Sequence, residues 1–213
     1  MLRALSSDKH ILLFLEVLLS FPLAHGDLLS VLLKIYGLPE TNRVAMRGRL
    51  QHAQKMGFPP GANTGKGRPA KYHAGEVLAL GLMFELFQFG ITPERAVSLL
   101  QYSAKQTIDA FNVAYDIFKR KLHDRAFAIV FPQELDRALG KGGSPALIVT
   151  TSSGFFLGDR MERGPRFAAV NVSALLDDVL EAAQSLDLTT REEFREDLRL
   201  WLLERGEDGW WLQ

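Results

Sequence analysis

The chain has 213 residues, enough for one large domain or two small ones with a buried core. Its hydrophobic fraction of 47% and charged fraction of 23% exclude a disordered chain. The absence of cysteine excludes disulfides, thiolate metal ligands and a thiol nucleophile, and it suits a reducing cytoplasm, where we expect the protein to reside.

The formal net charge of zero hides a strong asymmetry along the chain. Residues 174–208 hold eleven acidic side chains against four arginines. Residues 41–75 hold no Asp or Glu and seven basic side chains, which are Arg43, Arg47, Arg49, Lys55, Lys66, Arg68 and Lys71. The basic block therefore predicts an anionic partner.

The N-terminal segment, residues 1–25, is predicted to contain an amphipathic helix that is capped near Ser7 or Asp8 and ends at Pro22. The apolar run at 11–19 follows Asp8 and is interrupted by Glu16, and no small-x-small cleavage site comes after it. This pattern disfavours a signal peptide, and the run is too short and too charged for a membrane-spanning helix. We expect the helix to pack on a domain or on a second subunit.

Two helices joined by a tight turn are predicted next. The stretch "DLLSVLLKIYG" begins at Asp27 and closes at Gly37. The stretch "LPETNRVAMRGRLQHAQKMG" has Pro39 and Glu40 in its first turn and Gly57 as its stop. Together they form a helix-turn-helix pattern.

The second of these helices carries side chains suited to reading base edges. Arg43, Arg47 and Gln51 recur at a spacing of four, with Asn42 and Arg49 beside them. Arginine pairs with guanine, and asparagine or glutamine pairs with adenine. A merely solvated helix face is the alternative interpretation of these arginines.

The loop "GANTGKGRPAKY", residues 61–72, does not fit a nucleotide-binding P-loop. Only three residues separate Gly61 from Gly65-Lys66, and Gly67 stands where the Mg²⁺-binding hydroxyl is required. No buried strand precedes the loop either.

The same loop has the composition of a segment that lies against a nucleic-acid backbone. Lys66, Arg68 and Lys71 supply positive charge, and the glycines allow the backbone to approach phosphates closely. Lys66 to Pro69 also resembles the core of an AT-hook, which enters a narrow minor groove. Tyr72 either contacts a phosphate or closes the core, and a flexible linker is the alternative for the whole loop.

The remaining elements predict a mainly α fold with a smaller α+β part. Helices are expected at 73–90, at 91–103 with Thr92 as N-cap and Pro93 at N1, and at 105–122. Strands at 126–131, 145–153 and 166–172 and helices at 173–186 and 191–206 follow, the last opened by a capping box of Thr190 and Glu193.

Residues 27–103 run in the order helix, turn, helix and basic Gly-rich loop, followed by "KYHAGEVLALGLMFELFQFGITPERAVSLL". This order resembles the DNA-binding domain of MerR-type winged-helix regulators. The resemblance implies a winged helix-turn-helix whose wing is a β-hairpin. This sequence lacks the usual Arg-Tyr-Tyr/Trp-Glu run of the recognition helix. It also lacks metal-binding cysteines and a C-terminal coiled coil, so metal sensing is not implied.

Nothing in the sequence supports catalysis or a metal site. The histidines at 10, 25, 52, 73 and 123 show no ligand spacing. Ser152, Ser153 and Asp159 lie in "TTSSGFFLGD" without a Gly-x-Ser-x-Gly elbow or an obvious base. We predict no enzymatic activity and no cofactor.

The sequence therefore predicts a DNA-binding transcriptional regulator. Residues 26–103 would bind double-stranded DNA, and residues 104–213 would dimerise or receive a protein or small-molecule signal. Homodimerisation is expected because one such domain contacts few base pairs, and the helix at 1–25 and the pair Trp210 and Trp211 are the candidate seams. The DNA-binding candidates are Asn42, Arg43, Arg47, Arg49, Gln51, Lys66, Arg68, Lys71 and Tyr72. The alternative is a protein-interaction adaptor with a basic docking face, and no membrane partner is expected.

Overall fold

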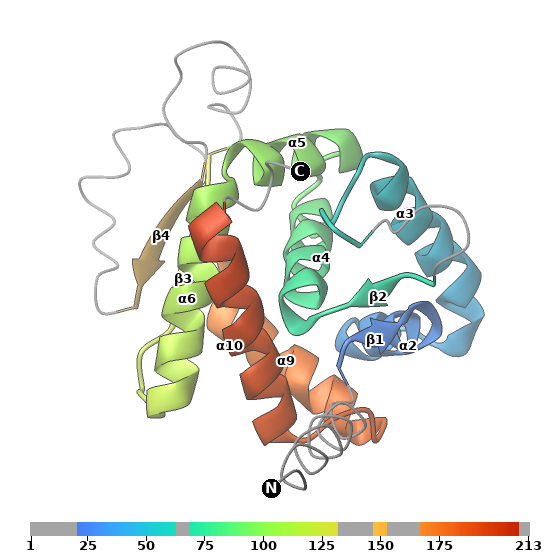
Figure 1. Cartoon of the computed structure of the whole chain (residues 1–213). Coiled ribbons are helices and arrows are strands. Elements are labelled where there is room, and N and C mark those ends of the chain that lie inside the picture. Colours follow the sequence, from blue (N-terminus) through green and yellow to red (C-terminus); the bar gives the residue numbers. More distant parts are fainter. Residues whose placement is uncertain (1–20, 63–68, 132–146, 153–166, 209–213) are drawn as a thin grey trace, which may run out of the picture.

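The computed structural model describes residues 21–62, 69–131, 147–152 and 167–208, and within them the protein is mainly helical, as predicted (Figure 1). The first half contains β1 (Leu23–Ala24), α2 (His25–Ile35), a 3₁₀ turn (Glu40–Asn42), α3 (Arg43–Lys55), β2 (Lys71–Tyr72), α4 (Ala74–Gln88) and α5 (Pro93–Tyr102). Figure 1 shows β1, α2, α3 and β2 gathered on one side of α4.

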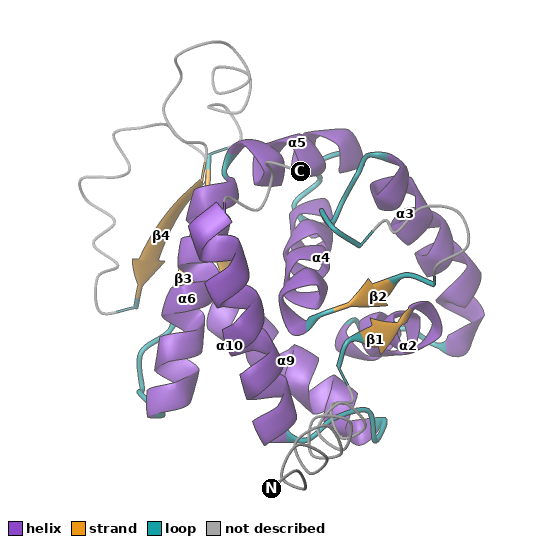
Figure 2. Cartoon of the chain, in the orientation of Figure 1, coloured by secondary structure: helices purple, strands orange, loops and turns teal. Residues whose placement is uncertain are grey.

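The second half places helices around a small sheet (Figure 2). It contains α6 (Ala104–Arg120), β3 (Ala126–Val130), β4 (Leu147–Thr151), β5 (Ala168–Asn171), α9 (Val172–Ser185) and α10 (Arg191–Asp208). β3 is the central strand and pairs antiparallel with β4 on one side and β5 on the other. Helices α6 and α9 pack against β3. The predicted α+β part is confirmed, and its sheet is antiparallel.

The start and stop signals in the sequence locate the helices well. Gly37 and Gly57 have φ values of 58° and 76°, the left-handed conformation that glycine adopts without steric cost. The predicted capping box is present, because the Glu193 amide donates to Thr190 Oγ1 at 3.2 Å and the Thr190 amide donates to Glu193 Oε2 at 2.7 Å.

The predicted N-terminal helix was expected to end at Pro22, and β1 follows at residues 23–24. Residues 1–20 lie outside the described ranges. One expectation about strands requires correction. The wing was expected to be a hairpin of its own. In the described residues, β2 pairs with β1, with Leu23 opposite Tyr72 and Ala24 opposite Lys71. A two-residue strand is too short to give a periodic signal, so the sequence did not reveal it.

Helix α4 runs through the centre of the molecule. Twelve of its fifteen residues are buried, as expected of a helix that is apolar on all faces. Two glycines let neighbouring helices approach it: a Cβ at Gly75 would overlap the Trp201 ring, and one at Gly81 would touch Leu175.

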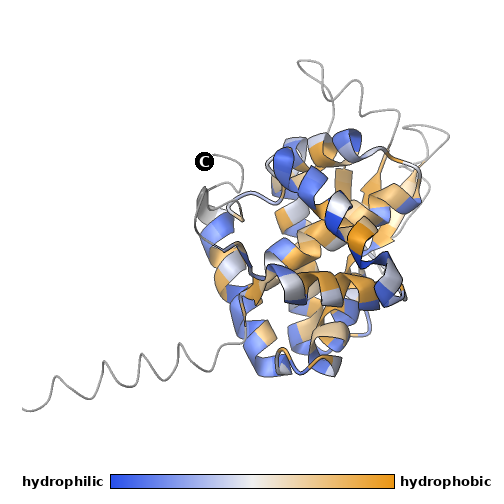
Figure 3. Ribbon diagram, turned by 90° about the vertical axis from the view of Figure 1, so that its right-hand side faces the viewer, coloured by the Kyte–Doolittle hydropathy of each residue, from blue (hydrophilic) through white to orange (hydrophobic). Residues whose placement is uncertain are grey.

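A single hydrophobic core joins the two predicted units, 26–103 and 104–213. It includes Leu29 of α2, Leu80 of α4, Phe111 of α6, Leu176 of α9 and Phe194 of α10. In Figure 3 the hydrophobic residues concentrate toward the interior and the hydrophilic ones toward the outer turns. The helices in the described part of the chain include none that is long and apolar enough to cross a membrane.

Candidate nucleic-acid interface

Helix α3 packs one face on the core and leaves the opposite face to solvent. Met46, Leu50 and Ala53 are buried at helical spacing. Arg47, Gln51 and Lys55 are exposed and follow one another at a spacing of four, so they form a row along the helix. The exposed face also includes Val44, whose side chain is 79% exposed, and Gly48.

Arg43 lies at the start of this helix, but it is held by intramolecular contacts. Its guanidinium pairs with Glu40, donates to Ser30 Oγ at 2.8 Å and donates to the Gly26 carbonyl at 3.3 Å. The hydrogen bond from Arg43 holds the pKa of Glu40 below its usual value. Arg43 thus joins α3 to α2, a role that the sequence analysis did not assign to it.

Arg49 and Asn42 lie apart from the row formed by Arg47, Gln51 and Lys55. Residues two positions apart are separated by about 200° around a helix, so exposed Arg49 stands on the other flank from Arg47. Asn42 is half-buried at the N-cap position of α3. The spacing in the sequence had predicted both beside Arg47.

Tyr72 is a core residue, which corrects its inclusion among the DNA-binding candidates. Its side chain is 0% exposed. The Gln54 amide donates to its hydroxyl, and His25 Nδ1 lies 3.4 Å from the same oxygen. Burial raises the pKa of Tyr72 to about 12. The tyrosine fastens β2 to α3 and to the start of α2.

Lys71, the neighbour of Tyr72, points the other way along the short strand and is exposed. It pairs with Ala24, one residue before His25. Partial burial and the nearby charge of Arg47 lower the pKa of His25. We call Arg47, Gln51, Lys55 and Lys71 the basic face. Lys66 and Arg68, which were also predicted to bind DNA, lie outside the described residues.

The acid-free segment 41–75 has several acidic neighbours in space. Glu40 pairs with Arg43, and Glu76 and Asp197 both bond to His73. On α3 itself, His52 Nε2 lies 2.9 Å from Oε1 of Glu94, a residue in the first turn of α5. This contact places a carboxylate at the margin of α3, on the side away from Arg47.

A polar cluster behind the loop was missed by the sequence analysis. Asp197 of α10 accepts from His73 Nδ1 at 2.8 Å and from the Ala74 amide at 2.7 Å. Glu76, only 2% exposed, accepts from Trp201 Nε1 at 2.8 Å and from the His73 amide at 2.6 Å. We call these residues, together with Arg205, the α4–α10 interlock.

The interlock ties the end of the chain to the start of the basic loop. Arg205 Nη2 lies 4.0 Å from Glu76 Oε1 and would be 2.8 Å from a Cβ at Gly61. Burial raises the pKa of Glu76, and the hydrogen bond to Asp197 raises the pKa of His73. The signal available in the sequence was the His73-x-x-Glu76 spacing, which is that of a capping box.

Ser152, considered from the sequence as a candidate nucleophile, follows β4. Its hydroxyl accepts from the Arg125 amide at 2.9 Å and donates to Asp124. Ser153 and Asp159 lie outside the described ranges. Among the described residues, no group of three or more His, Asp or Glu side chains is arranged to hold a metal ion.

Comparison of the chain with protein-family models, with curated proteins and with solved structures gives no match.

Proposed function

We propose that this protein is a sequence-specific DNA-binding transcriptional regulator of the winged helix-turn-helix kind. In this proposal the exposed face of α3 enters the major groove, and the loop between α3 and β2 lies along the phosphates. The observation that carries it is the basic face: Arg47, Gln51 and Lys55 share one row of an exposed helix, and Lys71 is exposed on the strand that follows.

The residue types on α3 match the chemistry of base edges. A guanidinium donates to guanine O6 and N7, and a glutamine amide pairs with adenine N6 and N7. Val44 offers a methyl surface to a thymine methyl group, and Gly48 leaves room beside the row for close approach. A helix of this diameter fits the major groove of B-DNA.

The positive charge near the helix supports contacts with phosphates. Arg49 on the other flank of α3 and Lys71 on β2 extend the charge beyond the row. If about six phosphates are neutralised, with Lys66 and Arg68 among the contacts, the logarithm of the binding constant falls with the logarithm of salt concentration at a slope near −5.

Twofold pairing belongs to the same proposal. A single helix-turn-helix unit contacts few base pairs, and a dimer doubles the site and makes the operator palindromic. The candidate seams are the helix predicted within residues 1–25 and the pair Trp210 and Trp211. Residues 1–20 and both tryptophans lie outside the described residues, so dimerisation remains a prediction.

Fluorescence anisotropy with duplex DNA tests the proposal. Random duplexes in dilute buffer should bind with steep salt dependence, and rounds of selection should yield a palindromic motif. Arg47→Ala should weaken binding to the selected motif more than to random duplex. Arg120→Ala, an exposed arginine at the end of α6, is the matched control and should change neither.

Two results would contradict parts of this account. Equal losses on both kinds of duplex would mean that Arg47 contacts only phosphates. No binding to any duplex in dilute buffer would overturn DNA binding and favour the adaptor alternative, in which the basic face docks an acidic protein.

A further inference from the structure

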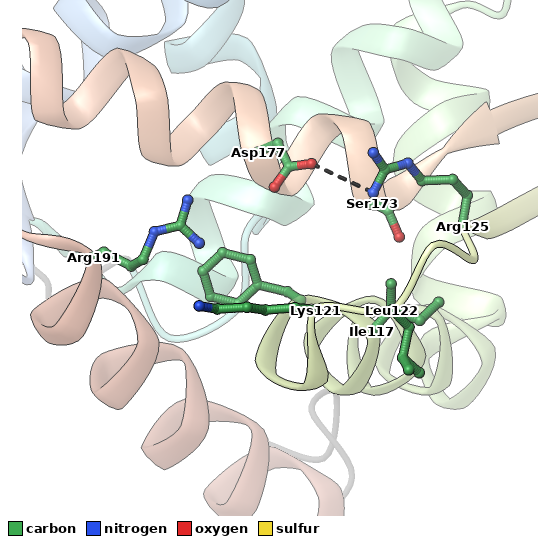
Figure 4. Close-up of a pocket in the computed structure, with 8 residues that line it drawn as sticks. Ile117, Lys121, Leu122, Arg125, Ser173, Asp177 and Arg191 are labelled. Carbon is green, nitrogen blue, oxygen red and sulfur yellow. Dashed lines mark ion pairs between the residues drawn. The ribbon is translucent and has the colours of Figure 1, made fainter.

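A pocket of about 140 Å³ lies where the end of α6 meets the starts of α9 and α10 (Figure 4). Its lining comes from all three helices and from the segment that leads into β3, and it consists of Ile117, Phe118, Lys121, Leu122, Arg125, Ser173, Asp177 and Arg191. None of these residues belongs to the basic face or to the α4–α10 interlock.

The backbone around the pocket brings the end of α6 back toward the sheet. Lys121 adopts a left-handed conformation with φ of 53° and ends the helix. The Leu122 amide donates to the Ile117 carbonyl at 3.1 Å, which closes the turn. Arg125 then stands at the entry to β3, and Arg191 is the first residue of α10.

The pocket carries an excess of positive charge. Lys121, Arg125 and Arg191 face a single carboxylate, that of Asp177. In Figure 4 the two guanidinium groups point into the space from opposite sides. Arg125 Nη1 lies 3.7 Å from Asp177 Oδ2, a loose ion pair, and in the described part of the chain neither Lys121 nor Arg191 has an ion pair.

The rest of the lining combines an apolar surface with one hydroxyl. The guanidinium carbon of Arg191 sits 4.9 Å from the centre of the Phe118 ring, and Ile117 and Leu122 extend the apolar surface. Ser173 Oγ accepts from the Ala126 amide at 2.9 Å and so has its own proton to donate. The starts of α9 and α10 add the positive ends of two helix dipoles, and the end of α6 opposes them.

We propose that this pocket binds a small organic anion. Arg191 and Lys121 hold its carboxylate or phosphate group, and Phe118 and Leu122 hold its apolar body. A volume of about 140 Å³ admits a small aromatic or aliphatic acid. The proposal is independent of DNA binding, since it uses no residue of α3 or β2.

Isothermal titration calorimetry on the full chain tests the site with benzoate, phenyl phosphate, inorganic phosphate and neutral benzyl alcohol. One of the two aromatic anions should bind at one site per chain. Inorganic phosphate and benzyl alcohol should bind at least about tenfold more weakly, because each lacks half of the recognised chemistry. Whichever aromatic anion binds tells which acid group the pocket prefers.

Variants assign the binding to the pocket. Arg191→Gln and Lys121→Gln should each weaken the bound aromatic anion about tenfold, the loss expected of a charge-assisted hydrogen bond. Arg191→Lys should restore part of the affinity, and Arg120→Gln, an exposed cation outside the pocket, should leave it unchanged. Circular dichroism checks that each variant is folded.

Three outcomes would overturn the proposal. The first is that neither aromatic anion binds at millimolar concentration. The second is that Arg120→Gln weakens binding as much as Arg191→Gln, which would indicate general charge attraction. The third is that benzyl alcohol binds as well as the anions, which would leave the cations without a role.

Discussion

Gly75 gives the most direct test of how α4 and α10 fit together. A Cβ placed on this residue would lie 2.1 Å from Cδ2 and Cε3 of the Trp201 ring. Ordinary contacts begin at 3.4 Å, so Gly75→Ala requires the ring or the helix to move by about 1.3 Å, the difference between these distances. The ring is buried, and its neighbours leave it little space to move.

The free-energy cost follows from three effects. Overpacking a core costs about 1–3 kcal/mol. Displacing Trp201 also weakens its 2.8 Å hydrogen bond to the buried Glu76 carboxylate, a bond of a kind worth about 1.5–3 kcal/mol. Alanine in place of a helical glycine returns about 1 kcal/mol. We therefore expect Gly75→Ala to lower the free energy of unfolding by about 2–4 kcal/mol.

Urea unfolding followed by circular dichroism measures this change. The control is Gly48→Ala in α3, where nothing lies within 4 Å of the added Cβ. There the free energy of unfolding should rise by up to about 1 kcal/mol. If Gly75→Ala proved as stable as Gly48→Ala, the close approach of α10 to α4 would be refuted.

Three further predictions concern residues whose roles the structure assigns. Tyr72→Phe should lower the free energy of unfolding by about 1 kcal/mol, because the hydroxyl contacts are lost, and should leave the DNA affinity unchanged. Weaker DNA binding at unchanged stability would show that the Tyr72 hydroxyl contacts DNA after all. Arg43→Ala should lower the urea midpoint, whereas Arg47→Ala should not, because only Arg43 bonds to α2; equal midpoints would contradict this. The pKa of His73 is raised, so protonated His73 and Asp197 stabilise the fold. This stabilisation is complete at pH values below the ordinary histidine pKa of 6.5, and it is lost as the pH rises through the raised pKa. The stability gap between wild type and His73→Asn should therefore be wider near pH 5.5 than near pH 8.5, and a gap independent of pH would contradict the pair.

Local signals in the sequence were enough to predict most helices. Gly57 ends α3 and Thr190 caps α10 because left-handed glycine and the capping box act within a few residues. The strands of the second half were also predicted, since β-rich runs between turns mark them without knowledge of their partners.

Contacts between distant segments could not be predicted in this way. The pairing of β1 with β2 joins residues 47 or more positions apart, through strands too short for any period to show. The contact of Asp197 with His73 spans 124 positions. From the sequence alone, Asp197 could not be distinguished from the other acidic residues of a helix whose charged face was expected to be solvated.

In the candidate site, too, local features were predictable and contacts between distant segments were not. Exposure of Arg47 and Gln51 follows from the spacing of Met46 and Leu50, so the row on α3 was predictable. The engagement of Arg43 was not, because its partners Ser30 and Gly26 belong to the preceding helix. Tyr72 could not be decided from the sequence, since a tyrosine suits a core and a phosphate contact equally.

The central claim, that α3 and β2 present a cationic surface to a double helix, is tested most directly by nuclear magnetic resonance. Isotope-labelled protein titrated with duplex DNA in dilute buffer should show amide shifts at residues 44–55 and at Lys71. Residues of α6 and α10 should stay unchanged. No shifts, or shifts confined to α6 and α10, would contradict the account.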